Sequence, residues 1–515
     1  MSSSAPGFAR VARSVALAAL LVAVGNAASR LLGLGRESAI AAYFARGTAV
    51  DAFTLAWTVP NQVYDLLING AVSAALVPVL SEYAEGDQDE FWRIVASIFN
   101  LALLALLLLI GLLFWQAPAI VARLAQSPAL EALTITLVRT LLPAVLLMAL
   151  SGLTTAVLYA RRTFLLPAFT GAIFNLGMIL GVVVLHNQLG VASLAVGASI
   201  GALGQVLVQA PGLRGWRYRP ILEWNHPAVR RIVLLYAPVA LGIGFSMIGT
   251  LVDRWLASGY VAALSTMRYA TTLIQFPLGL VATAVSVAVL PTLSRQDAAN
   301  DQAAFRATLA MGLKVVLLLV VPATAGMAVL VLPITRLLFE RGAFAGADSV
   351  ATSTALLYYL PGMPAAALDQ VLLFALYARR RTLAPNLVQG AAIGFYLGAA
   401  LLLLRFTQLG FLALVVGNSV QWIVHALIMF LLVRRHLSFR GLRLGEAIIK
   451  TTSASLLMAL ALFPLVAPLA PFPVLIQVAV LGTLGLLVYL LLCLCLRVEA
   501  LGFFWAAVAG RLRKK

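Results

Sequence analysis

The chain has 515 residues, of which 62% are hydrophobic and 10% are charged, with a mean hydropathy of +1.01. Soluble globular proteins carry about 25% charged residues, so this composition excludes an ordinary soluble protein and predicts many membrane-spanning segments. The formal net charge is +18. The basic residues form short clusters between apolar stretches and do not gather in one soluble domain, which argues against nucleic acid as a partner.

Apolar runs of about 20 residues, separated by Pro, Gly or charged residues, predict about 14 membrane-spanning helices. Their expected centres, in chain order, lie near Ala23, Ala56, Ala105, Leu147, Met178, Ala202, Ile243, Val281, Leu319, Leu360, Gly394, Val420, Met458 and Leu486. The first run follows Arg10 and Arg13 and resembles a signal peptide with Asn26-Ala27-Ala28 as a cleavage site. We expect an uncleaved first helix instead, because the next residues carry motifs that belong to a membrane core.

Two short motifs occur twice at nearly the same spacing. Leu158-Tyr159-Ala160-Arg161-Arg162 returns as Leu376-Tyr377-Ala378-Arg379-Arg380, and Val77-Pro78-Val79-Leu80-Ser81 returns as Leu290-Pro291-Thr292-Leu293-Ser294. The two offsets indicate that a unit of roughly 200 residues is duplicated. Each copy spans six helices, an even number, so both copies have the same orientation in the membrane.

The predicted fold is therefore an all-α polytopic membrane protein. It has two six-helix lobes in a parallel pseudo-two-fold repeat, followed by two C-terminal helices. The expected boundaries are residues 1–222 for the N-terminal lobe with helices 1–6, and 223–440 for the C-terminal lobe with helices 7–12. Residues 441–515 hold helices 13 and 14 and a basic tail. No soluble stretch longer than a loop is left for a nucleotide-binding cassette within these residues.

The distribution of basic residues predicts the topology. With a cytoplasmic N-terminus, roughly three-quarters of the 36 Lys and Arg residues lie at the termini or in loops after even-numbered helices. This bias indicates that both termini are cytoplasmic. The opposite side holds Arg46, Arg123, Arg139, Arg254, Arg268, Arg336, Arg341 and Arg405.

Neither metal nor cofactor chemistry is expected. Cys493 and Cys495 are the only cysteines, and two positions apart on a helix they point to different sides. The four histidines are scattered, without an HExxH motif. A membrane-bound glycosyltransferase would need catalytic acids on a large outer loop, and the short outer loops offer only Glu131, Glu340 and Asp348. The chain is therefore not expected to be an enzyme, and no catalytic residue is assigned.

Charged residues inside apolar segments are the strongest candidates for a binding site, because exposing them to lipid costs several kcal/mol. Arg30 falls about 22 Å into the first helix, and Arg36 lies near its outer boundary, with Gly33 and Gly35 between them. Two guanidinium groups can bind phosphate oxygens and keep their charge at any cellular pH. The alternative is that Arg36 extends to the interface or pairs with Asp51, while Arg30 pairs inside the bundle.

Weaker candidates lie in the second half of the chain. Arg268 and Thr272 are one helical turn apart, and Gln275 follows three residues later, so the three can face one cavity. Asp369 is expected to be a buried carboxylate and is a candidate for proton or cation coupling. The alternative is that a neighbouring hydroxyl or amide hydrogen-bonds to it and that it has no role in coupling. Asp253 is a second coupling candidate, unless Asp253 and Arg254 form an interfacial ion pair. Three asparagines lie in apolar segments, Asn61, Asn100 and Asn175, and intramembrane asparagines more often join helices than bind ligands. The acidic stretch 82–90 is expected to be a solvated cytoplasmic loop.

Taken in order, several short motifs resemble the MurJ/MviN lipid II flippases of the multidrug/oligosaccharidyl-lipid/polysaccharide exporter superfamily. In the first half these are Ser29-Arg30-Leu31-Leu32-Gly33 with Arg36, Asp51-Ala52-Phe53, Val59-Pro60-Asn61, residues 77–83, and Pro167-Ala168-Phe169 with Asn175. In the second half they are residues 253–258, Phe276-Pro277-Leu278-Gly279, residues 290–294, residues 338–344, and Tyr377-Ala378-Arg379. The likeness covers most of the chain, from helix 1 through at least helix 12.

The resemblance implies a two-lobed bundle of fourteen helices in the bacterial cytoplasmic (inner) membrane, with a central cationic cavity. It implies that lipid II, the undecaprenyl-diphosphate-linked peptidoglycan precursor, moves from the inner to the outer leaflet by alternating access, as part of cell-wall biogenesis and cell-shape maintenance. The polyprenyl tail would lie in a groove formed by helices 13 and 14. Expected partners are lipid II or a related polyprenyl-diphosphate glycolipid, membrane lipids, and the cell-wall synthesis machinery.

The sequence also departs from the family pattern. The family commonly carries an arginine shortly after Pro-Asn in helix 2 and another in a Tyr-Ala-x-Arg setting in helix 8. Neither is present in residues 60–65 or in Tyr269-Ala270-Thr271-Thr272, and Arg268 is a candidate substitute. A sodium site in some members uses acids on helices 7 and 11, but helix 11 offers only Asn386, Gln389 and Tyr396. An exporter of another polyprenyl-diphosphate oligosaccharide, or a non-transporting cell-wall scaffold, therefore stays open as an alternative.

Overall fold

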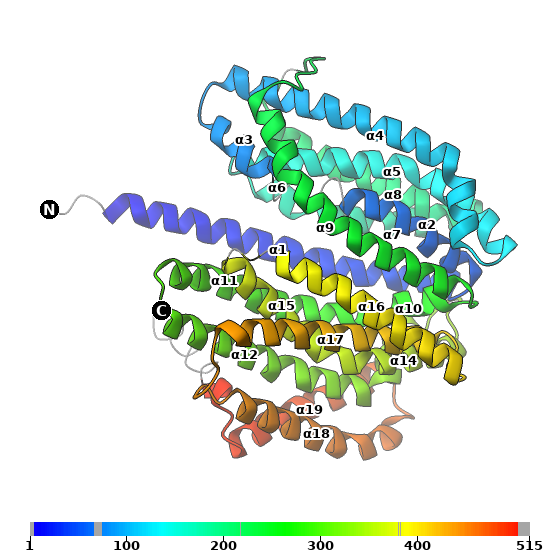
Figure 1. Ribbon diagram of the computed structural model, residues 1–515. Coiled ribbons are helices and arrows are strands. Elements are labelled where there is room, and N and C mark those ends of the chain that lie inside the picture. Colours follow the sequence, from blue (N-terminus) through cyan, green and yellow to red (C-terminus); the bar gives the residue numbers. More distant parts are fainter. Residues whose placement is uncertain (1–4, 66–74, 217, 380, 382, 503–515) are drawn as a thin grey trace. The chain divides into compact units, whose positions relative to one another are not determined.

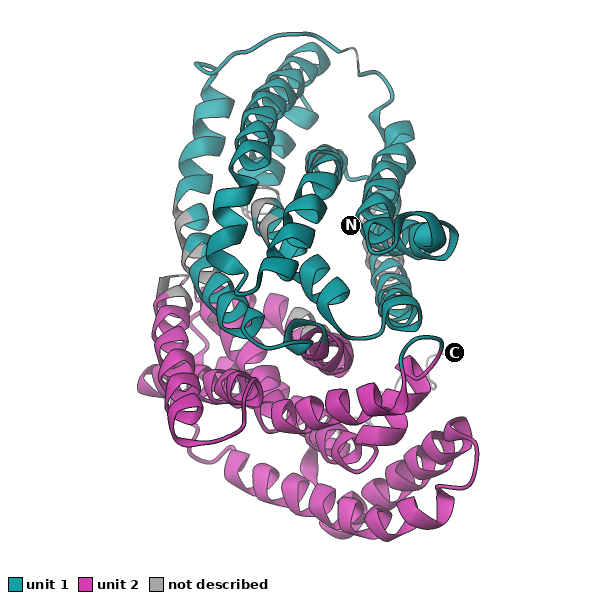
Figure 2. Ribbon diagram, turned by 90° about the vertical axis from the view of Figure 1, so that its right-hand side faces the viewer, with its two compact units in different colours: residues 1–265, 342–344 teal, residues 266–341, 345–515 magenta. Residues whose placement is uncertain are grey.

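The computed structural model describes residues 5–65, 75–216, 218–379, 381 and 383–502 (Figure 1). Over these residues it consists of helices and short connections, without a β-strand. It divides into two compact units (Figure 2): unit 1 is Met1–Ser265 with Gly342–Phe344, and unit 2 is Thr266–Arg341 with Ala345–Lys515. This division by compactness does not test the repeat boundaries at residues 222 and 440, which stay a prediction.

Unit 1 is built around α5, which lies between α2, α4 and α8. The long first helix packs along α7, and α7 packs against α8. The segment Asn26-Ala27-Ala28 lies inside the first helix. The elements are α1 (Ala5–Phe44), α2 (Thr48–Tyr64), α3 (Val77–Ala84), α4 (Gln88–Leu124), α5 (Pro128–Ala160), α6 (Leu165–Ala168), α7 (Thr170–Leu189), α8 (Ala192–Gln209), the 3-10 turn η3 (Ala210–Leu213) and α9 (Pro227–Ser258).

In unit 2, α15 contacts α11, α12 and α17, much as α5 contacts α2, α4 and α8 in unit 1. Here α17 packs against both α15 and α16, and α12 packs against α11, α15 and α18. The last two helices pack against each other and are seen beside α12 in Figure 1. The elements are α10 (Ala263–Pro277, which begins in unit 1), the π-helical turn η4 (Leu278–Ala282), α11 (Thr283–Ala298), α12 (Gln302–Val329), α13 (Val331–Phe339), α14 (Gly346–Tyr359), the 3-10 turn η5 (Leu360–Gly362), α15 (Met363–Ala378), α16 (Leu383–Phe406), α17 (Leu412–His436), α18 (Leu444–Leu469) and α19 (Val474–Cys495).

The all-helical membrane fold expected from the hydropathy is confirmed. Each of the expected segment centres falls within one of these helical elements. Among the described residues, ten helices are long and apolar enough to cross a membrane. Large apolar side chains such as Leu108, Trp115, Leu460 and Phe463 are exposed on α4 and α18, as expected for helix faces that contact lipid.

The duplication is visible in the hydrogen bonds that end corresponding helices. At the end of α5 the N–H of Thr163 donates to the carbonyl of Leu158 at 2.8 Å, and at the end of α15 Arg381 donates to Leu376 at 2.9 Å. Both bonds span five residues, as in a Schellman cap. The turns after α7 and before α17 also match, because Gly190 and Gly410 both have left-handed φ angles, 52° and 56°.

Small residues let α7 and α8 approach each other closely. A Cβ atom added to Gly177 would lie 2.3 Å from the Cα of Gly201, and one added to Gly181 would lie 2.3 Å from the Cα of Gly197. These two Gly-xxx-Gly pairs make a backbone-to-backbone contact of the kind common between membrane helices. Any larger side chain there would force the two helices apart.

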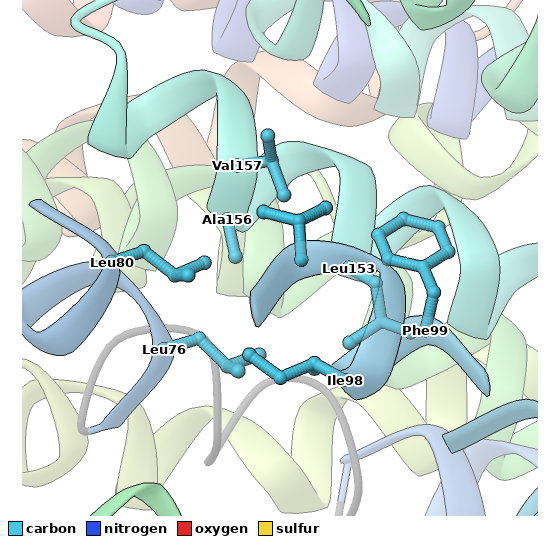
Figure 3. Close-up of a pocket in the computed structure, with 8 residues that line it drawn as sticks. Leu76, Leu80, Ile98, Phe99, Leu153, Ala156 and Val157 are labelled. Atoms are coloured by element: carbon cyan, nitrogen blue, oxygen red, sulfur yellow. The ribbon is translucent and has the colours of Figure 1, made fainter. Parts of the chain in front are cut away.

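An apolar cluster of unit 1 fills the space where α3, α4 and α5 meet. Figure 3 shows Leu80, Phe99 and Leu153 from these three helices lying around a small hollow. The hollow has no room for a water molecule and is lined by apolar side chains. It is part of the packed core and not a ligand site.

The acidic stretch 82–90, expected to be a simple solvated loop, forms ion pairs with basic side chains of unit 1. The charged groups are largely exposed, so each pair contributes at most about 1 kcal/mol. The pairs are Glu82–Arg231 at 2.6 Å, Glu85–Arg162 at 2.5 Å and Asp89–Arg219 at 3.6 Å, and Glu90 lies 3.8 Å from the ring of His226, which forms an ion pair only when protonated.

Candidate functional site

Arg36 is held in a defined orientation on α1. Its guanidinium lies 2.6 Å from the carboxylate of Glu37 and donates a further bond at 2.9 Å to the amide oxygen of Asn175 on α7. Glu37 is 2% exposed, whereas the Arg36 side chain retains 23% exposure. The arginine is therefore anchored on one side and keeps part of its surface accessible, as a group that binds an anion requires.

Asn175 joins this arginine to the backbone of α1. Its amide nitrogen donates to the carbonyl of Ser29 at 2.9 Å, while its oxygen accepts from Arg36. Gly33 lies opposite the same amide, because a Cβ added there would be 3.5 Å from the Asn175 nitrogen. The asparagine thus connects two helices, as expected, and also positions Arg36. Arg30 lies on the same helix and is half-buried.

Asp51 does not pair with Arg36, contrary to the alternative raised from the sequence. It is 3% exposed, and its carboxylate accepts the backbone N–H of Ser265 at 2.7 Å in the first turn of α10. The backbone N–H of Gly47 donates to the hydroxyl of the same serine at 3.2 Å. In this arrangement Asp51 caps a helix start, which is a structural role for the residue.

Arg268, Thr272 and Gln275 share one face of α10, as their spacing predicted. The hydroxyl of Thr272 donates to the backbone carbonyl of Arg268 at 2.9 Å. Arg268 and Thr272 are half-buried and Gln275 is exposed. These three residues belong to unit 2, whereas Arg30, Arg36 and Asp51 belong to unit 1.

The two coupling candidates differ in their partners. Asp253 lies 3.9 Å from the neighbouring Arg254, a weak contact between half-buried side chains. Asp369 lies in α15 and has a close partner in α17, since one carboxylate oxygen is 2.8 Å from the Nδ1 atom of His425. The side chains are 19% and 10% exposed, respectively. Asp369 is therefore satisfied by a titratable imidazole and not by a hydroxyl or amide.

The positions where the family commonly has further arginines are occupied differently. After Pro60, the Asn61 amide donates to the carboxylate of Asp65 at 2.9 Å. In α10, Tyr269 is fully buried, with its ring 5.2 Å from that of Phe339. Among the helix 11 residues, Tyr396 is 2% exposed and packs against Gly417, and the side chain of Asn386 lies outside the described residues.

An apolar cavity of about 200 Å³ opens in unit 2 between α12, α15, α17 and α18. Leu317, Leu372 and Phe430 line it from the first three of these helices, and Ile448 lines it from α18. Its lining includes α18 but not α19, so this cavity does not test the groove that the resemblance implies between helices 13 and 14, which stays a prediction. Elsewhere the described part of the chain has no cluster of three or more His, Cys, Asp or Glu side chains able to hold a metal ion.

Three residues that matter in this geometry escaped the sequence analysis or received a different role. Glu37 was missed because neighbouring positions on a helix do not normally face each other, and Arg36 reaches it only through its long side chain. Asn175 was expected to join helices only. His425 was treated as one of four scattered histidines. Its position halfway along an apolar helix, like that of Asp369, was the available signal.

Comparisons with known proteins fit this arrangement. Residues 40–486 match the family model described as "Lipid II flippase MurJ". The "Probable lipid II flippase MurJ" of Vibrio cholerae serotype O1 is 30% identical over 448 residues, covering 81% of this chain and 85% of the relative. That of Rhizobium meliloti is 30% identical over 461 residues and covers 84% of each chain. The "Lipid II flippase MurJ" of Burkholderia cenocepacia is 28% identical over 422 residues, 79% of this chain and 81% of the relative.

Solved structures agree with the fold. A structure titled "Lipid II flippase MurJ, inward closed conformation" superposes with a TM-score of 0.79 at 24% identity, covering 95% of this chain and all of that chain. An inward-facing multidrug resistance MATE family transporter of the MOP superfamily superposes with a TM-score of 0.65 at 15% identity, covering 79% of this chain and 94% of that chain. At these identities the likeness concerns the fold.

Proposed function

The chain belongs to the lipid II flippase MurJ family, and from that premise we propose that it moves lipid II from the inner to the outer leaflet of the bacterial inner membrane. The protein is a multi-pass transporter and carries out translocation, not bond chemistry. The observation that carries the proposal is the family match over residues 40–486 together with two arginines on α1, one of them oriented by Glu37 and Asn175.

The arginines fit the chemistry of the substrate. Lipid II presents a diphosphate between a polar headgroup and a long apolar tail, so its carrier needs fixed positive charge beside a place for hydrocarbon. A guanidinium binds phosphate oxygens through two parallel N–H bonds and cannot lose its charge near neutral pH. We assign Arg30, Arg36 and Arg268 to the diphosphate, with Thr272 and Gln275 as neutral hydrogen-bonding groups.

The apolar cavity beside α18 supplies a place for the tail. Its lining is hydrocarbon, from residues such as Leu313, Leu317 and Leu372, and prenyl chains are expected to enter such a space. Alternating access would then expose the diphosphate site to one leaflet at a time by rocking of the two lobes, with both termini in the cytoplasm. The repeat architecture suits this mechanism because each lobe packs internally.

A second function is favoured by one observation. Neither residues 60–65 nor Tyr269–Thr272 carries the further arginine common in the family, so the positive charge available for a diphosphate differs from the usual set. Export of another polyprenyl-diphosphate-linked oligosaccharide would need the same Arg30 and Arg36 but different contacts to the glycan. A scaffold in the cell-wall machinery would need neither arginine.

The test is rescue of a bacterium depleted of its own lipid II flippase, scored by how much lipid II becomes accessible on the outer leaflet. The parent protein should restore exposure. Arg30→Ala and Arg36→Ala should each reduce it by roughly ten- to a hundredfold, because removing a charged hydrogen-bond donor that contacts the substrate typically costs about 1.5–3 kcal/mol. Arg36→Lys should restore it in part, since lysine keeps the charge but loses the paired N–H bonds.

Glu446→Gln serves as the matched control, because Glu446 pairs with Lys450 at the start of α18 and is 45% exposed. Its exposure of lipid II should equal that of the parent. If a correctly inserted parent protein leaves lipid II unexposed, the same assay with other polyprenyl-diphosphate sugars distinguishes the second function from a scaffold.

A further inference from the structure

A hydrogen-bonded His–Asp pair lies halfway across the membrane in unit 2. Asp369 is ten residues before Arg379 on α15, and His425 is nine residues before Arg434 on α17, which places both about 14–15 Å from the basic ends of their helices. The hydrocarbon layer is about 30 Å thick, so both groups lie near its middle. Ionisable groups at this depth are costly and therefore usually functional.

The pair lies at the end of a row of contacts that joins α17 to a broken helix. Ser419, Trp422 and His425 follow at spacings of three residues on one face of α17. The Ser419 hydroxyl donates to the carbonyl of Tyr358 at 2.8 Å, where α14 is interrupted by the 3-10 turn η5. Within this turn, Gly362 has no room for a side chain, because an added Cβ would be 2.8 Å from the ring of Trp422. Interrupted helices of this kind are where transporters place their coupling sites.

The chemistry of the pair selects a proton over a metal cation. When Asp369 is ionised its carboxylate accepts the hydrogen bond, so Nδ1 of His425 carries the hydrogen and Nε2 has a free lone pair. In that state the pair has a net charge of −1 inside the membrane. One proton bound at Nε2 makes the pair neutral overall, which a low-dielectric interior favours. Sodium prefers oxygen ligands, and an imidazole nitrogen in contact with the only carboxylate of the pair is a poor substitute.

Other ionisable groups on the packed helices are engaged elsewhere or lie toward the ends of their helices. Tyr377 lies on the same helix, α15, two turns further along from Asp369. Engaged groups are Lys314 with Glu499, Arg379 with Asp297, Arg306 with the carbonyl of Arg440, Tyr359 with the ring of Trp422, and Tyr396 against Gly417. Terminal or exposed groups are Arg295, Asp348, Tyr358, Arg405, Arg434, Arg435 and His436.

We propose that His425 and Asp369 form the proton-binding site that couples outward movement of the lipid substrate to inward movement of protons. This inference rests on the proposed function and names its driving ion. The proton binds at Nε2 of His425 when the site is open to the acidic side and leaves on the cytoplasmic side. No bond other than the N–H bond forms or breaks. The net charge of the His425–Asp369 pair, which joins α15 to α17, therefore changes during the transport cycle.

The test uses the full-length protein in proteoliposomes with fluorescent lipid II, a pH difference of one unit and the membrane potential clamped at zero. With one proton exchanged per lipid, the parent should concentrate lipid II in the leaflet on the acidic side by about tenfold, whichever way the protein is inserted. Asp369→Asn and His425→Gln should still exchange lipid II between leaflets but should leave it evenly distributed. Glu446→Gln should match the parent.

Two results in this assay would overturn the proposal. One is a parent that exchanges lipid II without responding to the pH difference, or that responds to a sodium gradient instead. The other is an Asp369→Asn variant that still concentrates the lipid. A parent that moves no lipid II at all would count against the proposed function, and a separate measurement then decides the proton site.

That measurement is the pH titration of ¹⁵N-histidine-labelled protein by NMR. The chain has only four histidines, so His425→Gln assigns the signal of interest. The ring nitrogen signals of His425 should report uptake of a proton as the sample is acidified, and Asp369→Asn should change that uptake because the imidazole loses its carboxylate partner. A His425 ring that stays neutral at every pH at which the protein remains folded would refute the proton site without any transport assay.

Discussion

The helix pairs α7–α8 and α16–α17 occupy equivalent places in the two repeats but pack with different side chains. Gly177, Gly181 and Gly197 of unit 1 correspond, about 220 residues later, to Tyr396, Ala400 and Gly417 of unit 2. In the first pair the backbones touch, whereas in the second a buried tyrosine ring fills the space and one glycine makes room for it. The two copies of the duplicated fold thus keep the same helix arrangement, although the side chains that fill the contact between the two helices differ in size and position.

The largest expected effect comes from adding a side chain to the tight backbone contact between α7 and α8. Gly181→Ala should destabilise the protein by about 3 kcal/mol or more, because the new Cβ meets the backbone of Gly197 and cannot be accommodated by a side-chain movement. Gly417→Ala should cost about 1 kcal/mol, since its Cβ would be 3.0–3.1 Å from Tyr396 and Ala400 side-chain atoms, which can shift slightly. Thermal unfolding in detergent, followed by size-exclusion chromatography, measures both.

Gly111→Ala in α4 is the control, because no atom lies within 4 Å of its added Cβ. Equal losses for Gly181→Ala and Gly417→Ala would mean that the two pairs are packed alike, contrary to the comparison.

The next effect concerns a charge that unit 2 buries where unit 1 has an apolar residue. Lys314 of α12 is 5% exposed and lies 2.6 Å from Glu499, whereas the corresponding position of α4 is Leu101. Glu499→Gln should cost about 2 kcal/mol, because it leaves the buried ammonium without its counter-charge. The loss is below that of a fully buried pair because Glu499 is 52% exposed.

Adding Lys314→Leu to Glu499→Gln should restore most of the stability, since it copies the apolar residue of unit 1. Chemical unfolding monitored on the purified variants gives the comparison. A double variant less stable than Glu499→Gln alone would show that Lys314 contributes more than its pair with Glu499.

A smaller effect is expected from the arginine of the repeated Leu-Tyr-Ala-Arg motif. The Arg161 guanidinium lies 5.2 Å from the ring centre of Trp92, and that of Arg379 lies 5.3 Å from the ring centre of Phe305. Double-mutant cycles to alanine should give about 0.5–1 kcal/mol of coupling in each unit. The single change Arg379→Ala should nevertheless cost more than Arg161→Ala, because Arg379 bonds to the side chains of Asp297 and Gln302, whereas Arg161 makes long bonds of 3.4 Å to two backbone carbonyls. The motif would lack a shared structural role if only one cycle showed coupling.

These elements also show what the sequence could reveal. Apolar runs of about 20 residues determined where the helices lie, since each run must cross the same hydrocarbon thickness. The recurrence of Arg161 as Arg379 predicted the duplication, and their stacking on corresponding rings agrees with it. The partners of Arg36 and Asp369 could not be read in this way. Asn175 and His425 reach them from helices 139 and 56 residues away, and a pairing at such a distance leaves no periodic signal.

The smallest expected effect compares two ion pairs that differ in exposure. Arg231 and Glu82 of unit 1 are 56% and 51% exposed, whereas Arg379 and Asp297 of unit 2 are 17% and 29% exposed. Arg231→Ala should cost at most about 1 kcal/mol. Raising the salt concentration from 0.05 to about 1 M should remove that cost, because the screening length falls to about 3 Å. The cost of Asp297→Asn should persist in the same salt, since water and ions reach that pair less easily. A salt-resistant loss for Arg231→Ala would show that the acidic stretch 82–90 acts as one coupled network and not as separate exposed pairs.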